Sequence, residues 1–264
     1  MELTPYRVVA CNLAKSSENK MHDDTVARQY GFIGGLVPGV DVFAYMSHVP
    51  AKVWGRLFLE RGWMEGHFLK PVYDGETVEV TAREADGGLA IELRSRGELC
   101  GTATAKLPRA APTVRLDDFA AVEPVAKRLP VDGQTYRPGS WLGIVPYRQD
   151  VAERQEYLSA IHEAAPVYAA EAVLHPGTLL RTLNSALKEN VILGPWIHVS
   201  SALQHLTTAF AGDELTVRAK VADNYERKGH RFVELDGVVV ANGSRAVARC
   251  RHVAIYQPRE AAVA

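Results

Sequence analysis

Two segments of the chain carry apolar residues at helical spacing, and each follows a Pro-Gly pair. After Pro38-Gly39, apolar side chains stand at positions 40, 43, 46 and 49, and Pro50 ends the run. After Pro176-Gly177 they stand at positions 179, 183, 186 and 187. Spacings of three and four residues place such side chains on one face of a helix. The pattern predicts buried helices over residues 38–49 and 176–190.

A second pattern follows each predicted helix, namely short apolar runs separated by turn residues. Gly75 and Gly212 are each predicted to turn the chain between two strands, and a polar hairpin separates two of the strands that follow. The predicted strands are 78–83, 89–94 and 101–107 in one half and 215–221, 231–235 and 245–255 in the other, with hairpins at 85–88 and 224–229.

The two patterns show that the chain is an internal duplication. Pro176 lies 138 residues after Pro38, and Gly212 lies 137 residues after Gly75. Two landmarks with nearly the same offset indicate two copies of one unit. A proline-rich stretch over residues 108–138 is typical of a connecting segment. We therefore expect an N-terminal unit over residues 1–125 and a C-terminal unit over 126–264, each an α+β arrangement of one helix and an antiparallel sheet.

Composition excludes several classes of protein. The 264 residues are 47% apolar and 23% charged, with a formal net charge of -1, as in ordinary globular proteins. No block of like charges predicts nucleic-acid binding, and no apolar run is long enough for a signal peptide or a membrane span. We expect a cytoplasmic protein. Cys11, Cys100 and Cys250 are far apart, which predicts core residues rather than a disulfide framework or a zinc site. The sequence also predicts no metal site.

Several short motifs around the first predicted helix occur in one order. They are His22-x-Asp24, Ala27, Gly31-Phe32, Val37-Pro38-Gly39, Phe68-Leu69-Lys70-Pro71-Val72 and Gly75-Glu76. This order resembles the hotdog superfamily, specifically the double-hotdog relatives of MaoC-like (R)-specific enoyl-CoA hydratases. The resemblance implies a tandem (double) hotdog, with two antiparallel sheets each wrapping a central helix. It also implies an acyl-CoA or other acyl-thioester substrate, no cofactor apart from the coenzyme A of that substrate, and a homodimer.

The loop before the first helix carries the family's catalytic motif in altered form. The family shows Asp-x-Asn-Pro-x-His, whereas this chain reads Ser17-Glu18-Asn19-Lys20-Met21-His22. The asparagine and the histidine match in register, while serine and lysine replace the aspartate and the proline. Hydration of an enoyl thioester requires an acid, a base and donors for the enolate oxygen.

The resemblance implies a role for each candidate in this loop and at the helix that follows. His22 would transfer protons, with Asn19 beside it, and Glu18 or Asp24 would supply the carboxylate in place of the missing aspartate. Gly39, at the start of the helix, would donate a backbone N–H to the oxyanion. Asp23 is expected to cap a helix N-terminus.

The second half repeats this arrangement more weakly. His162-Glu163 precedes Pro176-Gly177 much as His22-Asp23 precedes Pro38-Gly39, and His175 stands directly before the second Pro-Gly pair. The candidate substrate-binding residues flank the two predicted helix starts; they are Ser17, Pro38, Asp41, Phe43, His162, His175 and Gly177.

Three functions remain open from the sequence. The first is a hydratase or dehydratase that acts on a 2-enoyl or 3-hydroxyacyl thioester. The second is a thioesterase, in which Asp41 would activate water. The third is a protein that binds acyl thioesters without catalysis, because the family's aspartate is missing. A fold alone does not decide among them.

Overall fold

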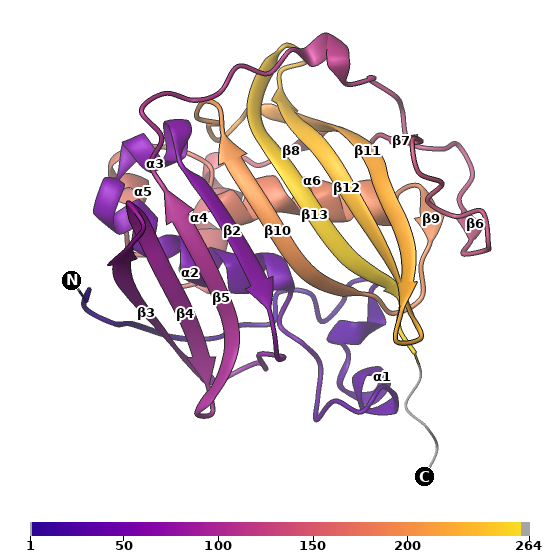
Figure 1. Cartoon of the computed structure of the whole chain (residues 1–264), viewed down its shortest axis with the longest axis horizontal. Helices are drawn as coiled ribbons and strands as arrows, with labels where there is room; N and C mark the ends of the chain where they lie inside the picture. Colours follow the sequence, from indigo (N-terminus) through magenta and orange to yellow (C-terminus); the bar gives the residue numbers. More distant parts are fainter. Residues whose placement is uncertain (1, 260–264) are drawn as a thin grey trace.

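One curved antiparallel sheet of eleven strands dominates the computed structural model, which describes residues 2–259 (Figure 1). The strand order is β1-β3-β4-β5-β2-β10-β13-β12-β11-β7, and β8 also pairs with β11. The strands of the first half are β1 (Tyr6–Val9), β2 (Trp63–Phe68), β3 (Thr77–Ala85), β4 (Gly88–Ser95) and β5 (Glu98–Lys106). Those of the second half are β7 (Trp141–Leu142), β8 (Tyr147–Arg148), β10 (Ile197–His205), β11 (Glu214–Arg227), β12 (His230–Ala241) and β13 (Arg245–Gln257).

The two halves of the sheet join at β2 and β10. These strands pair antiparallel, with Ser200 opposite His67 and Gln204 opposite Trp63. On either side of this junction the strand order repeats, because β5, β4 and β3 follow β2 as β13, β12 and β11 follow β10. The predicted α+β duplication is therefore present, but its two sheets form one continuous sheet.

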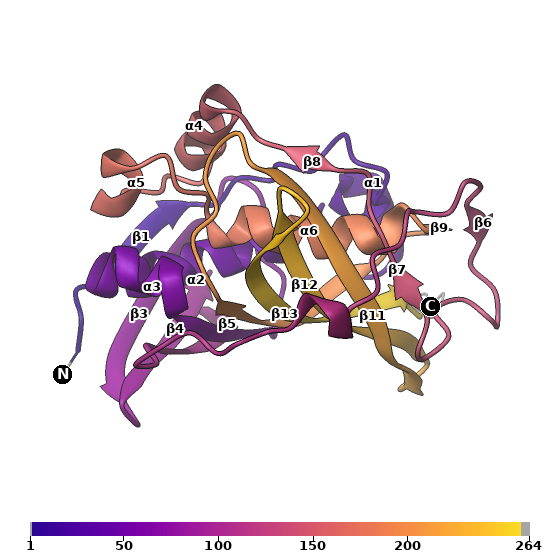
Figure 2. The same cartoon turned by 90° about the horizontal axis from the view of Figure 1, so that it is seen from above.

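Two central helices lie against one face of this sheet (Figure 2). They are α2 (Gly39–Trp54) and α6 (Pro176–Lys188), close to the predicted ranges. The prediction that Pro50 ends the first helix is wrong, because α2 continues through it to Trp54. A proline inside a helix removes one backbone hydrogen bond. Val49 and Ala51 on either side of it are buried, so packing maintains the helix at this point.

Short helices and strands surround this central unit. Helices α4 (Val151–Ala160) and α5 (Pro166–Ala170), which the sequence pattern did not predict, lie beyond α2 and α6 on the side away from the sheet (Figure 2). The remaining elements are η1 (Lys20–His22), α1 (Asp24–Gln29), α3 (Arg56–Arg61), η2 (Leu116–Asp118), β6 (Leu129–Pro130) and β9 (Val191–Ile192). Within residues 2–259, no helix has the length and apolar character required to cross a membrane.

The turn glycines stand where the duplication predicted them. Gly75 has a φ of 75° and Gly212 a φ of 89°, a conformation that glycine adopts without strain. The predicted hairpin at 224–229 is shorter than expected, because β11 runs to Arg227 and the turn is reduced to Lys228 and Gly229. Tyr225 and Phe232 stack across the two strands at this end, which explains the longer ladder.

Two buried histidines of the sheet are expected to make the fold sensitive to mild acid. Burial lowers the pKa of His205 and His252 to about 3, so both stay neutral in the folded chain. The unfolded chain takes up protons near pH 6.5, and stability is therefore constant above that pH and falls as the pH drops below it. We expect a slope of up to about 1.4 kcal/mol per pH unit for each histidine. Urea unfolding at pH 7.5 and pH 5 measures this slope, and equal stabilities at the two values would contradict it.

Candidate active site

Asn19 fixes the loop that precedes α1 against the second half of the chain. Its Oδ1 accepts hydrogen bonds from the backbone N–H of Met21 and of Trp196, both at 3.1 Å. Its Nδ2 donates to the carbonyl of Trp196 at 3.0 Å. One side chain therefore caps η1 and ties this loop to the segment that leads into β10.

His22 is held in one orientation by two contacts. Its Nδ1 lies 2.6 Å from the carbonyl of Leu36, and its Nε2 lies 3.2 Å from the Nδ2 of Asn19. A carbonyl only accepts hydrogen bonds, so Nδ1 carries the proton and Nε2 presents a lone pair. Burial lowers the pKa of His22, and the imidazole is therefore neutral at neutral pH. This tautomer is that of a general base.

The start of α2 leaves backbone donors open. Pro38 is the N-cap, and no side chain caps this end. The first backbone N–H groups of a helix have no partner within the helix and carry partial positive charge. An ideal Cβ on Gly39 would lie 2.6 Å from the Nδ1 of His198, so only glycine fits here. His198 itself is fixed through Ser201, at 2.7 Å from the Oγ.

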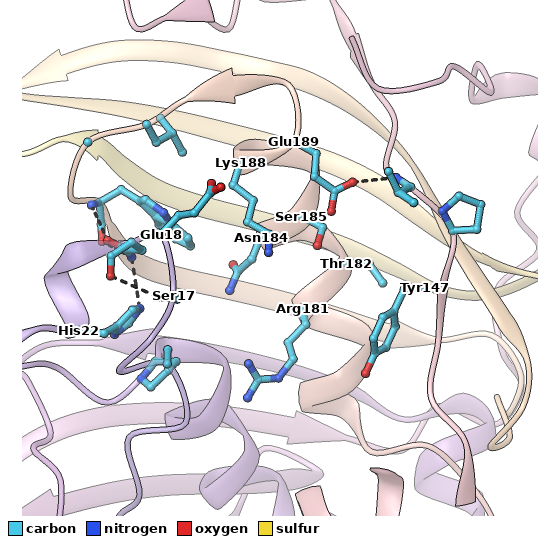
Figure 3. A pocket seen from close by; sticks show the side chains of 18 residues that line it. Ser17, Glu18, His22, Tyr147, Arg181, Thr182, Asn184, Ser185, Lys188 and Glu189 are labelled. Atoms are coloured by element: carbon cyan, nitrogen blue, oxygen red, sulfur yellow. Dashed lines mark hydrogen bonds between the residues drawn. The ribbon is translucent and has the colours of Figure 1, made fainter. Parts of the chain in front are cut away.

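Two cavities meet at His22. One, called the polar cavity below, has a volume of about 430 Å³ and carries polar and charged side chains from the first loop and α6, including Ser17, Glu18, Arg181 and Lys188 (Figure 3). The other, of about 620 Å³, is mainly apolar and reaches Gly39. Both are lined by Asn19, His22, Pro38, Asn184 and Trp196. An extended ligand whose reacting atoms lie beside His22 therefore has space on both sides.

The corresponding start of α6 is closed. His175 caps this helix, since its Nδ1 accepts the N–H of Gly177 at 3.1 Å. An ideal Cβ on Gly177 would lie 2.2 Å from the hydroxyl of Tyr157, just as one on Gly39 would meet the ring of His198. Tyr157 is held by a hydrogen bond of 3.1 Å to the Oδ1 of Asp41. The two helix starts differ in their caps, because the side chain of His175 accepts the N–H of Gly177 at α6, whereas no side chain caps α2 and Gly39 lines the larger cavity.

Glu163 supports the closed site. It accepts hydrogen bonds from His48 at 2.7 Å, from His175 at 3.2 Å and from the backbone N–H of Ala165 at 2.6 Å. The side chains of Glu163, His48 and His175, which form this cluster, are almost completely buried. Burial alone raises the pKa of Glu163, but the hydrogen bonds from His175 and His48 outweigh it and lower the pKa to about 2. The carboxylate therefore stays charged between the two central helices.

Some of the residues proposed from the sequence gather at the α2 site, and others do not. Ser17, Glu18, Asn19, His22, Pro38 and Gly39 line one or both cavities. The carboxylate of Glu18, however, is bound by Arg128 at 2.8 and 3.2 Å. Asp24 accepts the N–H of Gly35 at 2.7 Å, so its side chain shapes the loop. Asp23 caps α1, as predicted.

The remaining proposed residues lie elsewhere. Asp41 is buried between Tyr157 and Arg181, with its Oδ1 at 2.5 Å from the guanidinium. Phe43 is completely buried in the core. His162 is exposed, and its carbonyl accepts the hydroxyl of Tyr6 at 2.8 Å. His175 and Gly177 belong to the closed start of α6.

The sequence reasoning missed the wall that α6 contributes to the polar cavity. Arg181, Asn184, Ser185 and Lys188 all line it. Their spacing places them on one helical face, away from the apolar positions that identified this helix. This stripe of polar residues could have indicated in the sequence that α6 contributes to the site. Among the described residues, no group of three or more His, Cys, Asp or Glu side chains is arranged to hold a metal ion.

Replacing Gly39 by alanine is expected to damage the open site. The added methyl group meets a histidine ring that Ser201 holds in place, so the start of α2 must shift. Small displacements of catalytic groups cost up to about 100-fold in rate, and overpacking costs about 1–3 kcal/mol in stability. If the chain acts on an enoyl thioester, as the sequence resemblance implies, kcat/KM should fall about 10- to 100-fold. Gly133→Ala, where the methyl group meets nothing within 4 Å, is the matched control. Full activity in Gly39→Ala would show that the substrate does not use this helix start.

Comparison with known proteins shows the fold. No protein-family model matches the chain, and no curated protein matches it. Among solved structures, a MaoC domain protein from Chloroflexus aurantiacus, described as a candidate dehydratase, is similar with a TM-score of 0.64 and 12% identity, over 98% of this chain and 94% of that one.

Two further structures agree with this result. A conserved hypothetical protein from Mycobacterium tuberculosis, described as a double hotdog fold, has a TM-score of 0.64 and 14% identity over 96% and 95% of the two chains. A candidate thioesterase from Novosphingobium aromaticivorans has a TM-score of 0.54 and 12% identity over 84% and 88%. The chain therefore has the α+β double hotdog fold that the resemblance implied.

Proposed function

We propose that this protein adds water to the double bond of a 2-enoyl-CoA thioester and catalyses the reverse dehydration of a 3-hydroxyacyl-CoA. The observation that carries the proposal is that His22, in its neutral form, and the uncapped start of α2 line the same cavity. These are the two elements that the reaction requires, a base for water and donors for the enolate oxygen.

The proposed reaction uses one base. The Nε2 of His22 takes a proton from water, and the resulting hydroxide attacks C3 of the enoyl group. The electrons of the double bond move onto the thioester oxygen, where the backbone N–H groups at the start of α2 stabilise the enolate. The enolate then collapses, and C2 receives the proton from His22. The ring returns to its neutral form, and atoms and charge balance over the cycle.

Leu36 and Asn19 act as positioning residues in this scheme. The carbonyl of Leu36 holds the Nδ1 proton and stabilises the imidazolium that forms after proton transfer. The amide of Asn19 approaches Nε2 at 3.2 Å, a long contact that a water molecule replaces when it binds to the base. No carboxylate is needed to fix the tautomer, because a backbone carbonyl does so.

The position of Asp41 favours hydration over thioester hydrolysis. A thioesterase of the type considered above requires a carboxylate that activates water. The carboxylate of Asp41 instead pairs with Arg181 and Tyr157, and Asp41 is not among the residues that line either cavity. The larger cavity also carries Arg227 and Lys228, whose charges suit the phosphates of coenzyme A, whereas its Lys70 pairs with Glu98 at 2.5 Å.

A direct test incubates the purified protein with crotonyl-CoA and with butyryl-CoA, which have the same chain length. The proposal predicts that 3-hydroxybutyryl-CoA forms from crotonyl-CoA and that no free thiol is released from butyryl-CoA. Release of coenzyme A from butyryl-CoA would instead support the thioesterase. Binding of both compounds without turnover would support the non-catalytic alternative.

A further inference from the structure

A row of hydrogen-bond donors on α6 faces the polar cavity. Arg181, Asn184 and Lys188 project from this helix into the same space, opposite Ser17 and His22 (Figure 3). The Oδ1 of Asn184 is buried without a hydrogen-bond partner in the part of the chain that the structure describes. This wall is unlike the apolar lining of the larger cavity.

The charge of Lys188 is not neutralised by a direct ion pair. Within residues 2–259, no carboxylate lies within 4 Å of its ammonium group, and its side chain is exposed. Of the two acidic residues of the cavity, Glu18 pairs with Arg128 and lies near enough to Lys188 for the lysine charge to help lower its pKa, and Glu189 accepts the backbone N–H of Val145 at 2.7 Å. Lys188 therefore remains available to an anion.

Asp41 and Tyr157 hold the guanidinium of Arg181 in place, but part of this group remains exposed. One of its terminal nitrogens, Nη2, donates to the Oδ1 of Asp41 at 2.5 Å, and the guanidinium lies 5.2 Å from the centre of the Tyr157 ring. Its side chain is 31% exposed, whereas Asp41 is fully buried. Asp41 and Tyr157 thus hold the guanidinium, while its partial exposure leaves N–H groups that a second acceptor can reach.

We propose that this wall of α6 binds a carboxylate at the far end of the acyl group, so that the substrate is the CoA monothioester of a short unsaturated dicarboxylic acid. This inference rests on the proposed function, in which the reacting carbons lie beside His22. With coenzyme A in the larger cavity, the end of a short acyl chain reaches the polar cavity. A methyl terminus would leave the charge of Lys188 without a partner and the exposed part of the Arg181 guanidinium unused, whereas a carboxylate can accept hydrogen bonds from both.

The test compares the binding of two unreactive ligands of the same length, succinyl-CoA and butyryl-CoA, by titration calorimetry. We expect succinyl-CoA to bind the unmodified protein at least about tenfold more tightly, the usual effect of one charge-assisted contact. Lys188→Met is expected to remove most of this preference. Lys52→Met, which replaces an exposed lysine outside both cavities, should preserve the preference.

Failure of this inference is distinguishable from failure of the proposed function. Equal affinities, tighter binding of butyryl-CoA, or an unchanged preference in Lys188→Met would each overturn the carboxylate site. Hydration is measured separately with the monothioester of fumaric acid and with crotonyl-CoA. Preference for succinyl-CoA without hydration of either enoyl compound would keep the carboxylate site and reject the hydratase. Hydration of crotonyl-CoA without a preference for succinyl-CoA would keep the hydratase and reject the carboxylate site.

Discussion

His22→Ala is expected to lower kcat/KM for the hydration of crotonyl-CoA by about 10² to 10⁴, the usual contribution of one general acid or base. The imidazole is the only proton-transfer group that the proposed reaction uses, so no second side chain compensates for its loss. Because burial lowers its pKa, the active neutral form persists into weakly acidic solution. In the unmodified protein, activity should therefore be constant above pH 6.5 and fall only below it, as His22 becomes protonated.

The matched control is His67→Ala, since His67 is about half exposed on β2 and does not line either of the two cavities. This variant should retain the activity of the unmodified protein. Circular dichroism should show that His22→Ala is folded. A His22→Ala enzyme that keeps near full activity would show that the base lies elsewhere.

Glu163→Ala is expected to lower the free energy of unfolding by about 3–5 kcal/mol, as for other buried charges that lose a partner network. The change leaves His48, His175 and the N–H of Ala165 without their shared acceptor. For a chain of this size it corresponds to a fall in Tm of roughly 6–20 °C. Urea unfolding at pH 7 measures the loss in the free energy of unfolding.

The pH dependence identifies the carboxylate as the cause. The pKa of Glu163 is lowered to about 2, so its contribution is fully present above its ordinary value of 4.5 and is lost as the pH falls below that value. The difference in the free energy of unfolding between Glu163→Ala and the unmodified protein should therefore become smaller as the pH falls below 4.5. Glu156→Ala, an exposed position on α4, should change stability by less than about 0.5 kcal/mol. An equal effect of the two substitutions would contradict the role of the cluster.

Much of the fold could be predicted because its signals are local. The two Pro-Gly helix starts and the two turn glycines appear directly in the sequence, and their common offset revealed the duplication. The continuous sheet could not be predicted from the sequence, because the pairing of β2 with β10 joins strands that are far apart in the chain. Helices α4 and α5 also escaped prediction; their short lengths, and the weak apolar pattern of α4, give little periodic signal.

The site could be predicted only where its residues share one loop. The register of Asn19 and His22 with a known motif identified both, and the structure places them together. The bond from Asn19 to Trp196 spans 177 residues, and no local pattern reveals such a contact. We expected Glu18 to supply a carboxylate to His22. In the structure Arg128, from the connecting segment, binds the Glu18 carboxylate instead. Glu163, which supports the cap of α6 through His175, also binds His48, which lies 115 residues away in the chain.

The most direct test of the central claim is a crystal structure of the protein with butyryl-CoA, which binds as a thioester but cannot be hydrated. The account predicts one ligand per chain, with the thioester oxygen within hydrogen-bond distance of the backbone N–H groups at the start of α2 and with C3 beside the Nε2 of His22. A thioester bound at the start of α6, next to Gly177 and Tyr157, or one whose C3 lies away from His22, would contradict it.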